Sequence, residues 1–154
     1  RSTQAKTLFP YTTLFRSEFY QKFVDDDVHF VSNKTYDLLR CSKAALVTSG
    51  TATLETALLN VPEIVCYRTS TISYEIGKRV VKNIKFISLV NLIMDREIVK
   101  ELIQKELNTE NLVNELQKIL EGQKRDEMLK NYELLREKLG GKGASEHAAE
   151  IIVN

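Results

Sequence analysis

Apolar and polar positions along residues 28–89 switch between two periods. Four short apolar runs have the length and composition of buried parallel strands: 28–31, 44–47, 64–67 and 86–89. Between them, apolar residues recur at helical spacing in 36–39, 52–59 and 76–81, the last segment being opened by Ser70 or Ser73. Asn60 tolerates left-handed geometry and Pro62 cannot continue a helix, so the middle helix is expected to end there. This alternation predicts right-handed β-α-β units and an α/β fold, a Rossmann-like parallel sheet with flanking helices.

After Asn91 the pattern is wholly helical. We expect four further helices, around 99–103, 109–120, 128–139 and 146–153, the last one capped by Ser145. Gly122 and the pair Gly140-Gly141 follow apolar helical positions, where glycine commonly ends a helix. These helices are expected to form the outer layer of the same domain.

Residues 1–17 differ from the rest of the chain because they show no clear helical or alternating period. Their stretch TLFPYTTLFRS, residues 7–17, resembles the translation of a sequencing adaptor fused in frame to a gene fragment. We therefore expect residues 1–17 to be non-native and the native part to be residues 18–154, a domain truncated on its N-terminal side. The alternative is a short natural strand or extension, in which Leu8, Phe9 and Tyr11 would pack.

Length and composition indicate one ordinary globular domain. The chain has 154 residues, of which 43% are hydrophobic and 28% charged, and its formal net charge is +1. No dense basic run with interleaved aromatics occurs, which argues against a nucleic-acid partner. No apolar stretch reaches the roughly 20 residues of a membrane span, and the N-terminus lacks the apolar region of a signal peptide. Cys41 and Cys66 lie in apolar stretches without metal-ligand spacing, so we expect buried thiols in a reducing cytoplasm.

The turn after the 44–47 strand carries the clearest candidate chemistry. It places Ser49, Gly50, Thr51 and Thr53 at the start of a helix, beyond the carboxyl end of a strand. Ligands bind at this position in open α/β sheets, and the unpaired amides and the helix dipole favour phosphate there. Gly50 permits close backbone approach and the hydroxyls add hydrogen bonds, so a diphosphate fits this turn without a metal.

Glu55 lies one turn into the same helix, and capping does not explain it. A capping box needs Ser or Thr three positions earlier, where the chain has Ala52. The carboxylate could instead accept hydrogen bonds from both hydroxyls of a ribose. The alternative is an ordinary polar helix start with Glu55 near the helix dipole, and the residues alone leave both interpretations open.

Several motifs then follow in order along the chain: SGTATLE at 49–55, VPEIVCYR at 61–68, KRVVK at 78–82, NL at 91–92, RE at 96–97 and ELIQ at 101–104. From about residue 28 to the C-terminus, this series resembles the lipid-A-disaccharide synthases. One departure is Val90, which stands where that family commonly has proline, whereas Asn91 is retained.

The resemblance implies the C-terminal half of a two-Rossmann-domain glycosyltransferase fold. It implies transfer of 2,3-diacylglucosamine from its UDP derivative to 2,3-diacylglucosamine 1-phosphate in lipid A biosynthesis, with inversion and release of UDP. The donor site would place Ser49, Gly50, Thr51 and Thr53 around the diphosphate, Glu55 on the ribose, and Tyr67 and Asn91 around the rest of the donor. The catalytic residues would lie in the missing N-terminal domain, so the fragment alone is expected to be inactive. No metal or other cofactor is implied.

Two expectations about partners accompany the resemblance. The faces of helices 128–139 and 146–153 would be covered only partly by this domain, so we expect self-association, as a homodimer. The basic residues Lys78, Arg79, Lys82 and Lys85 suggest peripheral contact with the cytoplasmic face of the inner membrane; a solvated helix face is the alternative. Arg68 likewise could meet phosphate or acyl carbonyls, or could pair with a surface Glu.

Other polar clusters have simpler explanations. Asp25, Asp26 and Asp27 precede the expected strand rather than follow it, which favours a solvated loop over a metal site. His29 and His147 lack partners at ligand spacing. Three alternatives to the donor-binding enzyme stay open: a nucleotide-binding regulatory module, another UDP-sugar transferase or epimerase, and a helical interaction domain.

Overall fold

The structure is a computed structural model that describes residues 31, 33–48, 50–70 and 85–140. The chain divides into two compact units, Arg1–Thr35 and Tyr36–Asn154, and the elements considered below belong almost entirely to the second. In chain order they are α2 (Thr35–Cys41), β1 (Ala45–Thr48), α3 (Thr51–Leu58), β2 (Glu63–Tyr67), α5 (Leu89–Met94), β3 (Lys100–Ile103), a 3-10 turn (Gln104–Glu106), α6 (Thr109–Leu120) and α7 (Gln123–Leu139).

The described strands form one parallel sheet in the order β1-β2-β3. In the register, Val47 pairs with Val65 and Cys66 pairs with Leu102. Each strand is separated from the next by a helical crossover, α3 in the first case and α5 in the second. Parallel neighbouring strands need such crossovers. The parallel sheet with helical crossovers confirms the predicted α/β, Rossmann-like fold.

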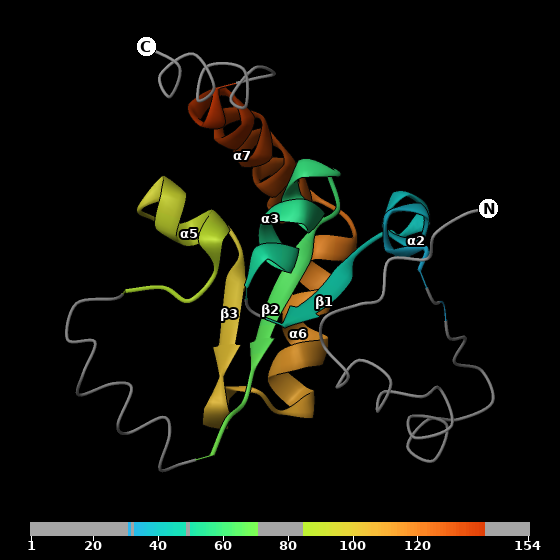
Figure 1. Cartoon of the computed structure of the whole chain (residues 1–154). Coiled ribbons are helices and arrows are strands. Elements are labelled where there is room, and N and C mark those ends of the chain that lie inside the picture. Colours follow the sequence, from blue (N-terminus) through green and yellow to red (C-terminus); the bar gives the residue numbers. More distant parts are fainter. Residues whose placement is uncertain (1–30, 32, 49, 71–84, 141–154) are drawn as a thin grey trace, which may run out of the picture. The chain divides into compact units, whose positions relative to one another are not determined.

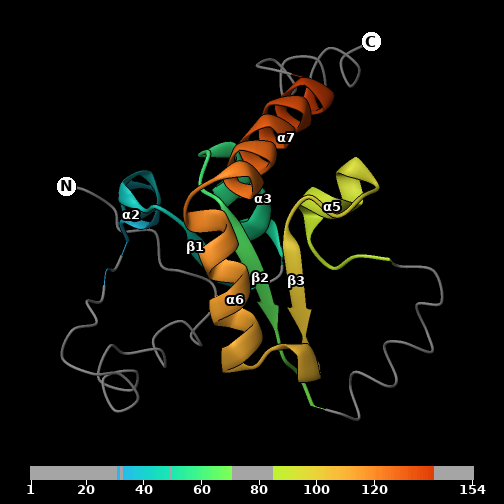
Figure 2. The same cartoon turned by 180° about the vertical axis from the view of Figure 1, so that it is seen from behind.

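Helices cover both faces of this sheet. Figure 1 shows α3 in front of the strands and α6 behind them, and Figure 2 shows the reverse. α3 packs on β1 and β2, α6 packs on β2 and β3, and α7 contacts α3, α5 and α6. The core between these layers consists of buried residues from β2, from β3 and the residues just before it, and from the helices α3, α5, α6 and α7, among them Ala57, Ile64, Val65, Val99, Leu102, Ile119, Met128, Tyr132 and Leu135.

Two predicted elements are wrong. The run 86–89 is not a strand: Ser88 caps the N-terminus of α5, its hydroxyl accepting from the amide of Asn91. The predicted helix at 99–103 is strand β3, in which Leu102 is buried. Short apolar runs do not distinguish a buried strand from a helix, and the pairing with β2 decides the outcome here.

The other helix boundaries agree more closely. Asn108 caps α6 by accepting from the amide of Asn111, and the helix ends at Leu120 as expected. α7 begins at Gln123 rather than at Met128, and Gly140 ends it with φ 77°. Asn60 has the expected left-handed backbone, with φ 61°. The predicted elements at 28–31, 76–81 and 146–153 lie, apart from Val31, outside the described residues.

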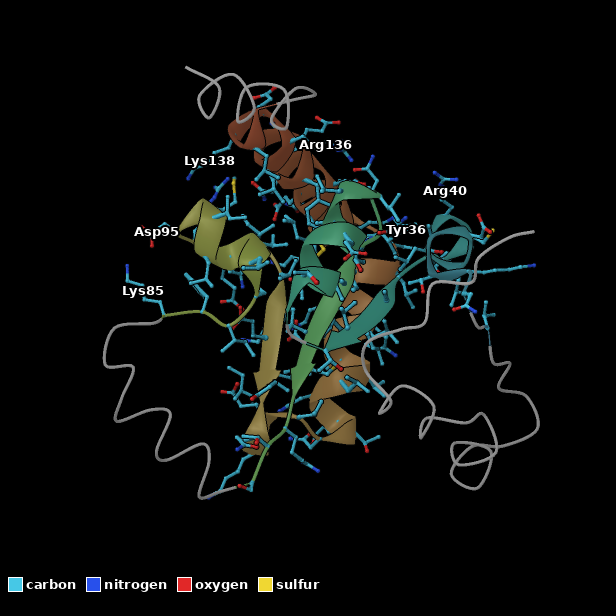
Figure 3. All side chains as sticks on the ribbon, viewed as in Figure 1. Tyr36, Arg40, Lys85, Asp95, Arg136 and Lys138 are labelled. Atoms are coloured by element: carbon cyan, nitrogen blue, oxygen red, sulfur yellow. The ribbon has the colours of Figure 1, made fainter. Side chains whose placement is uncertain are left out.

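Two basic side chains of α7 donate hydrogen bonds to carbonyls at the ends of α3 and α5 (Figure 3). Arg136 donates to the carbonyl of Leu58, at the end of α3, and to the Asn60 side chain. Lys138 donates to the carbonyl of Ile93, in the last turn of α5, at 2.5 Å. Cations at these positions satisfy carbonyls that have no partner within their own helix. α7 therefore holds α3 and α5 in place.

The expectation of two buried thiols is wrong for Cys41, which is exposed at the end of α2. α2 buries none of its residues, so its apolar positions do not mark a core face. Cys66 is half-buried in β2, and this burial raises the pKa of its thiol.

Candidate functional site

The turn between β1 and α3 is built around the backbone of Gly50. Gly50 is the N-cap residue of α3 and has φ 124° and ψ −160°. A side chain is strained at this φ, although a β carbon placed there would meet nothing within 4 Å. The backbone angle therefore requires glycine, and the space beside the turn stays open to an approaching group. Ser49 lies outside the described residues.

Thr53 stabilises this turn through two hydrogen bonds to Gly50. Its amide and its hydroxyl both donate to the carbonyl of Gly50, at 3.3 Å and 2.8 Å, and its side chain is buried. Gly50 has no side chain that could accept from the first amides of α3. Thr51 and Ala52 are exposed in the first turn. The free amides and the helix dipole form a position that favours an anion, whereas the hydroxyl proton of Thr53 is already committed to the turn.

Glu55 has a partner that the sequence analysis missed. The Tyr36 hydroxyl donates to Glu55 Oε2 at 2.9 Å, which links α2 to α3. Figure 3 labels Tyr36 between α2 and α3. The hydrogen bond and the negative charge of Glu55 raise the pKa of Tyr36. The sequence offers only a weak signal for this contact, namely a tyrosine in the short helix before β1. Nothing in the sequence pairs Tyr36 with Glu55.

Tyr67 shares the carboxyl edge of the sheet with this turn. It is the last residue of β2 and pairs with Ile103 of β3, while Cys66 before it pairs with Thr48 of β1. Its side chain is half-buried. The parallel register therefore brings Tyr67 to the same edge as the residues that enter the turn.

Asn91 lies in α5 and is fully buried. Its Oδ1 accepts from the amides of Ile98 and Val99 at 2.7 Å and 3.0 Å. Its Nδ2 donates to the Val99 carbonyl and to Glu101 Oε1, both at 2.9 Å. The amide group thus has four protein partners that join α5 to β3, and contact with a donor would require exchange of one of these bonds. That contact stays a prediction.

Glu101 is the centre of this polar cluster and was also missed. Its carboxylate accepts from the amides of Ile87 and Ser88, from the Ser88 hydroxyl and from Asn91 Nδ2, all between 2.8 and 3.0 Å. Four donors stabilise a carboxylate that is only 8% exposed. A Glu inside an apolar run is the available signal, but the spacing of the run at 99–103 predicts a helix and so does not predict a buried position for this Glu.

Arg68 bonds to backbone carbonyls among the described residues, and its contact with phosphate or acyl carbonyls stays a prediction. It donates to the carbonyls of Gln104 and Leu107, at 3.3 Å and 2.7 Å, so it holds the turn after β3. Of the expected basic patch only Lys85 is described, and it lies 3.5 Å from Asp95 in an exposed ion pair (Figure 3). Asp25, Asp26, Asp27, His29 and His147 lie outside the described residues.

The described residues contain neither a metal-binding cluster nor a membrane-spanning helix. In this part of the chain, no group of three His, Cys, Asp or Glu residues is arranged to hold a metal ion. None of the helices described is long and apolar enough to cross a membrane.

Comparison with known proteins shows the family. The sequence model of the Lipid-A-disaccharide synthetase family matches residues 4–153. The chain is 36% identical over 144 residues to a lipid-A-disaccharide synthase of Myxococcus xanthus, covering 92% of this chain and 37% of that protein. It is 42% identical over 123 residues to one from Syntrophus aciditrophicus, covering 79% and 32% respectively. The chain thus spans about a third of the length of the curated relatives it matches. It belongs to the lipid-A-disaccharide synthetase family.

Proposed function

We propose that this chain is the donor-binding part of an inverting hexosyltransferase of lipid A biosynthesis. The full enzyme would transfer 2,3-diacylglucosamine from its UDP derivative to 2,3-diacylglucosamine 1-phosphate and release UDP. The family match over residues 4–153 carries this proposal, because the matched relatives are named lipid-A-disaccharide synthases. Since the chain spans 37% of the Myxococcus xanthus relative, the proposal assigns the general base to sequence outside this chain, and the fragment alone would not transfer sugar.

The proposed donor site is centred on the start of α3. Ser49, Gly50 and Thr51 would surround the diphosphate together with Thr53, which would hold the Gly50 turn in place through its hydroxyl. Glu55 would bind the ribose, and Tyr67 and Asn91 would border the rest of the donor. The open space beside Gly50 and the uncapped start of α3 support the phosphate assignment. Because the positive end of a helix stabilises the phosphate charge, no metal or other cofactor is needed for binding.

Two further parts of the proposal concern partners. The exposed Leu134 and Leu139 of α7 support self-association as a homodimer, since 42% and 40% of their surfaces are open to solvent. The exposed Lys85 is compatible with peripheral contact at the cytoplasmic face of the inner membrane, where each basic residue contributes on the order of 1 kcal/mol. Sedimentation across concentrations tests the first, and co-sedimentation with anionic vesicles tests the second.

Calorimetric titration with UDP and with inorganic diphosphate, in EDTA, tests the donor site. Glu55→Gln keeps the shape of the side chain but removes its charge. It should weaken UDP binding roughly tenfold or more, because charge-assisted hydrogen bonds to the ribose hydroxyls are lost. Diphosphate has no ribose, so its affinity should stay unchanged.

Thr51→Val serves as the matched control for this experiment. It removes an exposed hydroxyl from the first turn of α3 at nearly constant volume, and it should weaken both ligands to a similar degree. Equal losses of UDP and diphosphate in Glu55→Gln would refute the ribose assignment. No UDP binding by the folded parent protein at millimolar ligand would refute the donor site as a whole.

A further inference from the structure

The contact between Tyr36 and Glu55 adds a residue to the proposed donor site. Tyr36 lies in α2, which precedes β1, and Glu55 lies in α3, which follows it. The two are 19 positions apart in the chain, yet the hydroxyl lies 2.9 Å from Glu55 Oε2. This inference rests on the proposed function, because it concerns how the same site recognises a nucleoside diphosphate.

Thr51 and Glu55 define the direction in which a ligand would lie. They are four positions apart on α3 and so share one face of the helix, about 6 Å apart along its axis. Thr51 is exposed in the first turn, where the free amides lie, and Glu55 is half-buried one turn further on. A ligand whose phosphates occupy the first turn would therefore reach Glu55 with its next chemical group.

Tyr36 is the one side chain among the described residues that bonds to the Glu55 carboxylate. No basic side chain in this part of the chain forms an ion pair with Glu55. The carboxylate therefore keeps its charge unneutralised and has most of its acceptor capacity left, since an ionised carboxylate has about four lone-pair positions and Tyr36 takes one. Among the described residues, no side chain donates to Oε1.

We propose that Tyr36 is a positioning residue, which holds the Glu55 carboxylate so that its remaining acceptor positions meet the two vicinal hydroxyls of the ribose in a nucleoside diphosphate. A glutamate side chain on a helix surface otherwise samples several rotamers, and binding would have to order it. A hydrogen bond at Oε2 orders the side chain before the ligand arrives. Because the pKa of Tyr36 is raised, its phenol keeps the proton and stays a donor throughout the neutral range.

Tyr36→Phe tests this role, because it removes only the hydroxyl. Tyr36 is 55% exposed, so the substitution should leave the melting temperature almost unchanged. Titration of the full chain with UDP should show a roughly three- to tenfold loss of affinity, the effect of one lost hydrogen bond. The affinity for 2′-deoxy-UDP should fall less than the affinity for UDP. The affinity for inorganic diphosphate should not change. Leu38→Ala, an exposed change in the same helix, should alter none of these affinities.

The double variant Tyr36→Phe/Glu55→Gln separates positioning from an independent contact. If Tyr36 acts through Glu55, removing its hydroxyl should cost nothing further once the carboxylate is gone, so the two effects should not add. Additive losses, an equal loss for UDP and diphosphate, or unchanged UDP affinity in Tyr36→Phe would each overturn the inference. Tighter UDP binding would also overturn it, since Tyr36 would then compete with the ribose for Glu55.

The failure of this inference is distinguishable from the failure of the proposed function. A selective loss of UDP in Glu55→Gln, combined with a silent Tyr36→Phe, keeps the donor site and removes Tyr36 from it. A parent protein that does not bind UDP, or a Glu55→Gln variant that loses UDP and diphosphate equally, removes the ribose assignment and the role of Tyr36 together.

Discussion

The Asn91 amide donates to Glu101 Oε1 at 2.9 Å, inside a cluster that has almost no contact with solvent. The pair joins the first turn of α5 to the middle of β3. Asn91 also accepts from two backbone amides, and Ser88 donates to the same glutamate oxygen at 2.8 Å. A proposed donor-site residue is therefore also a structural residue, and its substitution would change the fold and the site at once.

Asn91→Ala should lower the free energy of unfolding by about 2–4 kcal/mol, because it leaves two buried amides and part of a buried carboxylate without partners. Chemical denaturation measures the loss. Asn114→Ala, an exposed change in α6, is the control and should stay within about 0.5 kcal/mol of the parent. A stable Asn91→Ala protein would mean that the cluster has water or another partner in place of the amide.

Gly50 offers a test of the turn itself. Gly50→Ala forces a side chain onto a backbone with φ 124° and should cost about 1–3 kcal/mol, or shift the turn to relieve the strain. Either result should weaken both UDP and diphosphate. Gly122→Ala is the matched control, since Gly122 also has positive φ, 87°, and open space around it, but it starts α7. Its destabilisation should be similar and its ligand affinities normal; parallel losses of affinity in both variants would contradict the site.

Glu63 and Tyr132 introduce a pH dependence of stability. Glu63 is fully buried at the start of β2, and neither of its carboxyl oxygens has a hydrogen-bond partner among the described residues. Burial raises its pKa to about 9 from an ordinary value of 4.5. The Tyr132 hydroxyl, on α7, lies near Glu63 and is also buried, and this burial raises its pKa. The folded protein thus holds Glu63 as a neutral acid.

Because the unfolded chain loses this proton near pH 4.5 and the folded chain near pH 9, stability should fall as pH rises between these values. The slope from this group is about 1.4 kcal/mol per pH unit. Glu63→Met should remove this slope and raise the melting temperature most at the alkaline end of the window. Melting curves from pH 5 to pH 8 measure the effect. Glu133→Gln, on the exposed side of α7, should leave the slope as in the parent, and a parent protein with no slope would show that Glu63 is charged in the fold.

Deletion of residues 1–17 tests their expected non-native origin. The truncated protein should keep the melting temperature and the UDP affinity of the parent, because a segment without an evolved role contributes no required contact. Both quantities are measured side by side by thermal denaturation and calorimetry. A large loss of either would identify the segment as a structural element of the domain.

Local periodicity in the sequence was sufficient for β1, β2, α3 and α6. In these segments, the spacing of apolar residues, the Asn60-Pro62 stop and the glycine after the 44–47 strand act over a few positions, and the fold does not override them. The same local information predicted an anion-binding position at the start of α3 and a ligand contact for Glu55, and both stay proposals. The ordered motifs from residue 49 to residue 104 were enough to indicate the family.

Tertiary structure alone decided the features that depend on distant partners. Leu102 belongs to a strand rather than a helix because β2 supplies its ladder partners. Glu101 is buried with hydrogen-bond partners because Ser88 and Asn91, which precede the strand, donate to its carboxylate. Tyr36 meets Glu55 only once the chain from α2 through β1 to α3 has folded. A short apolar run has similar local preferences for helix and for strand, and a single polar residue has similar local preferences for a buried and for an exposed position. The free energy that decides between them comes from long-range hydrogen bonds and burial.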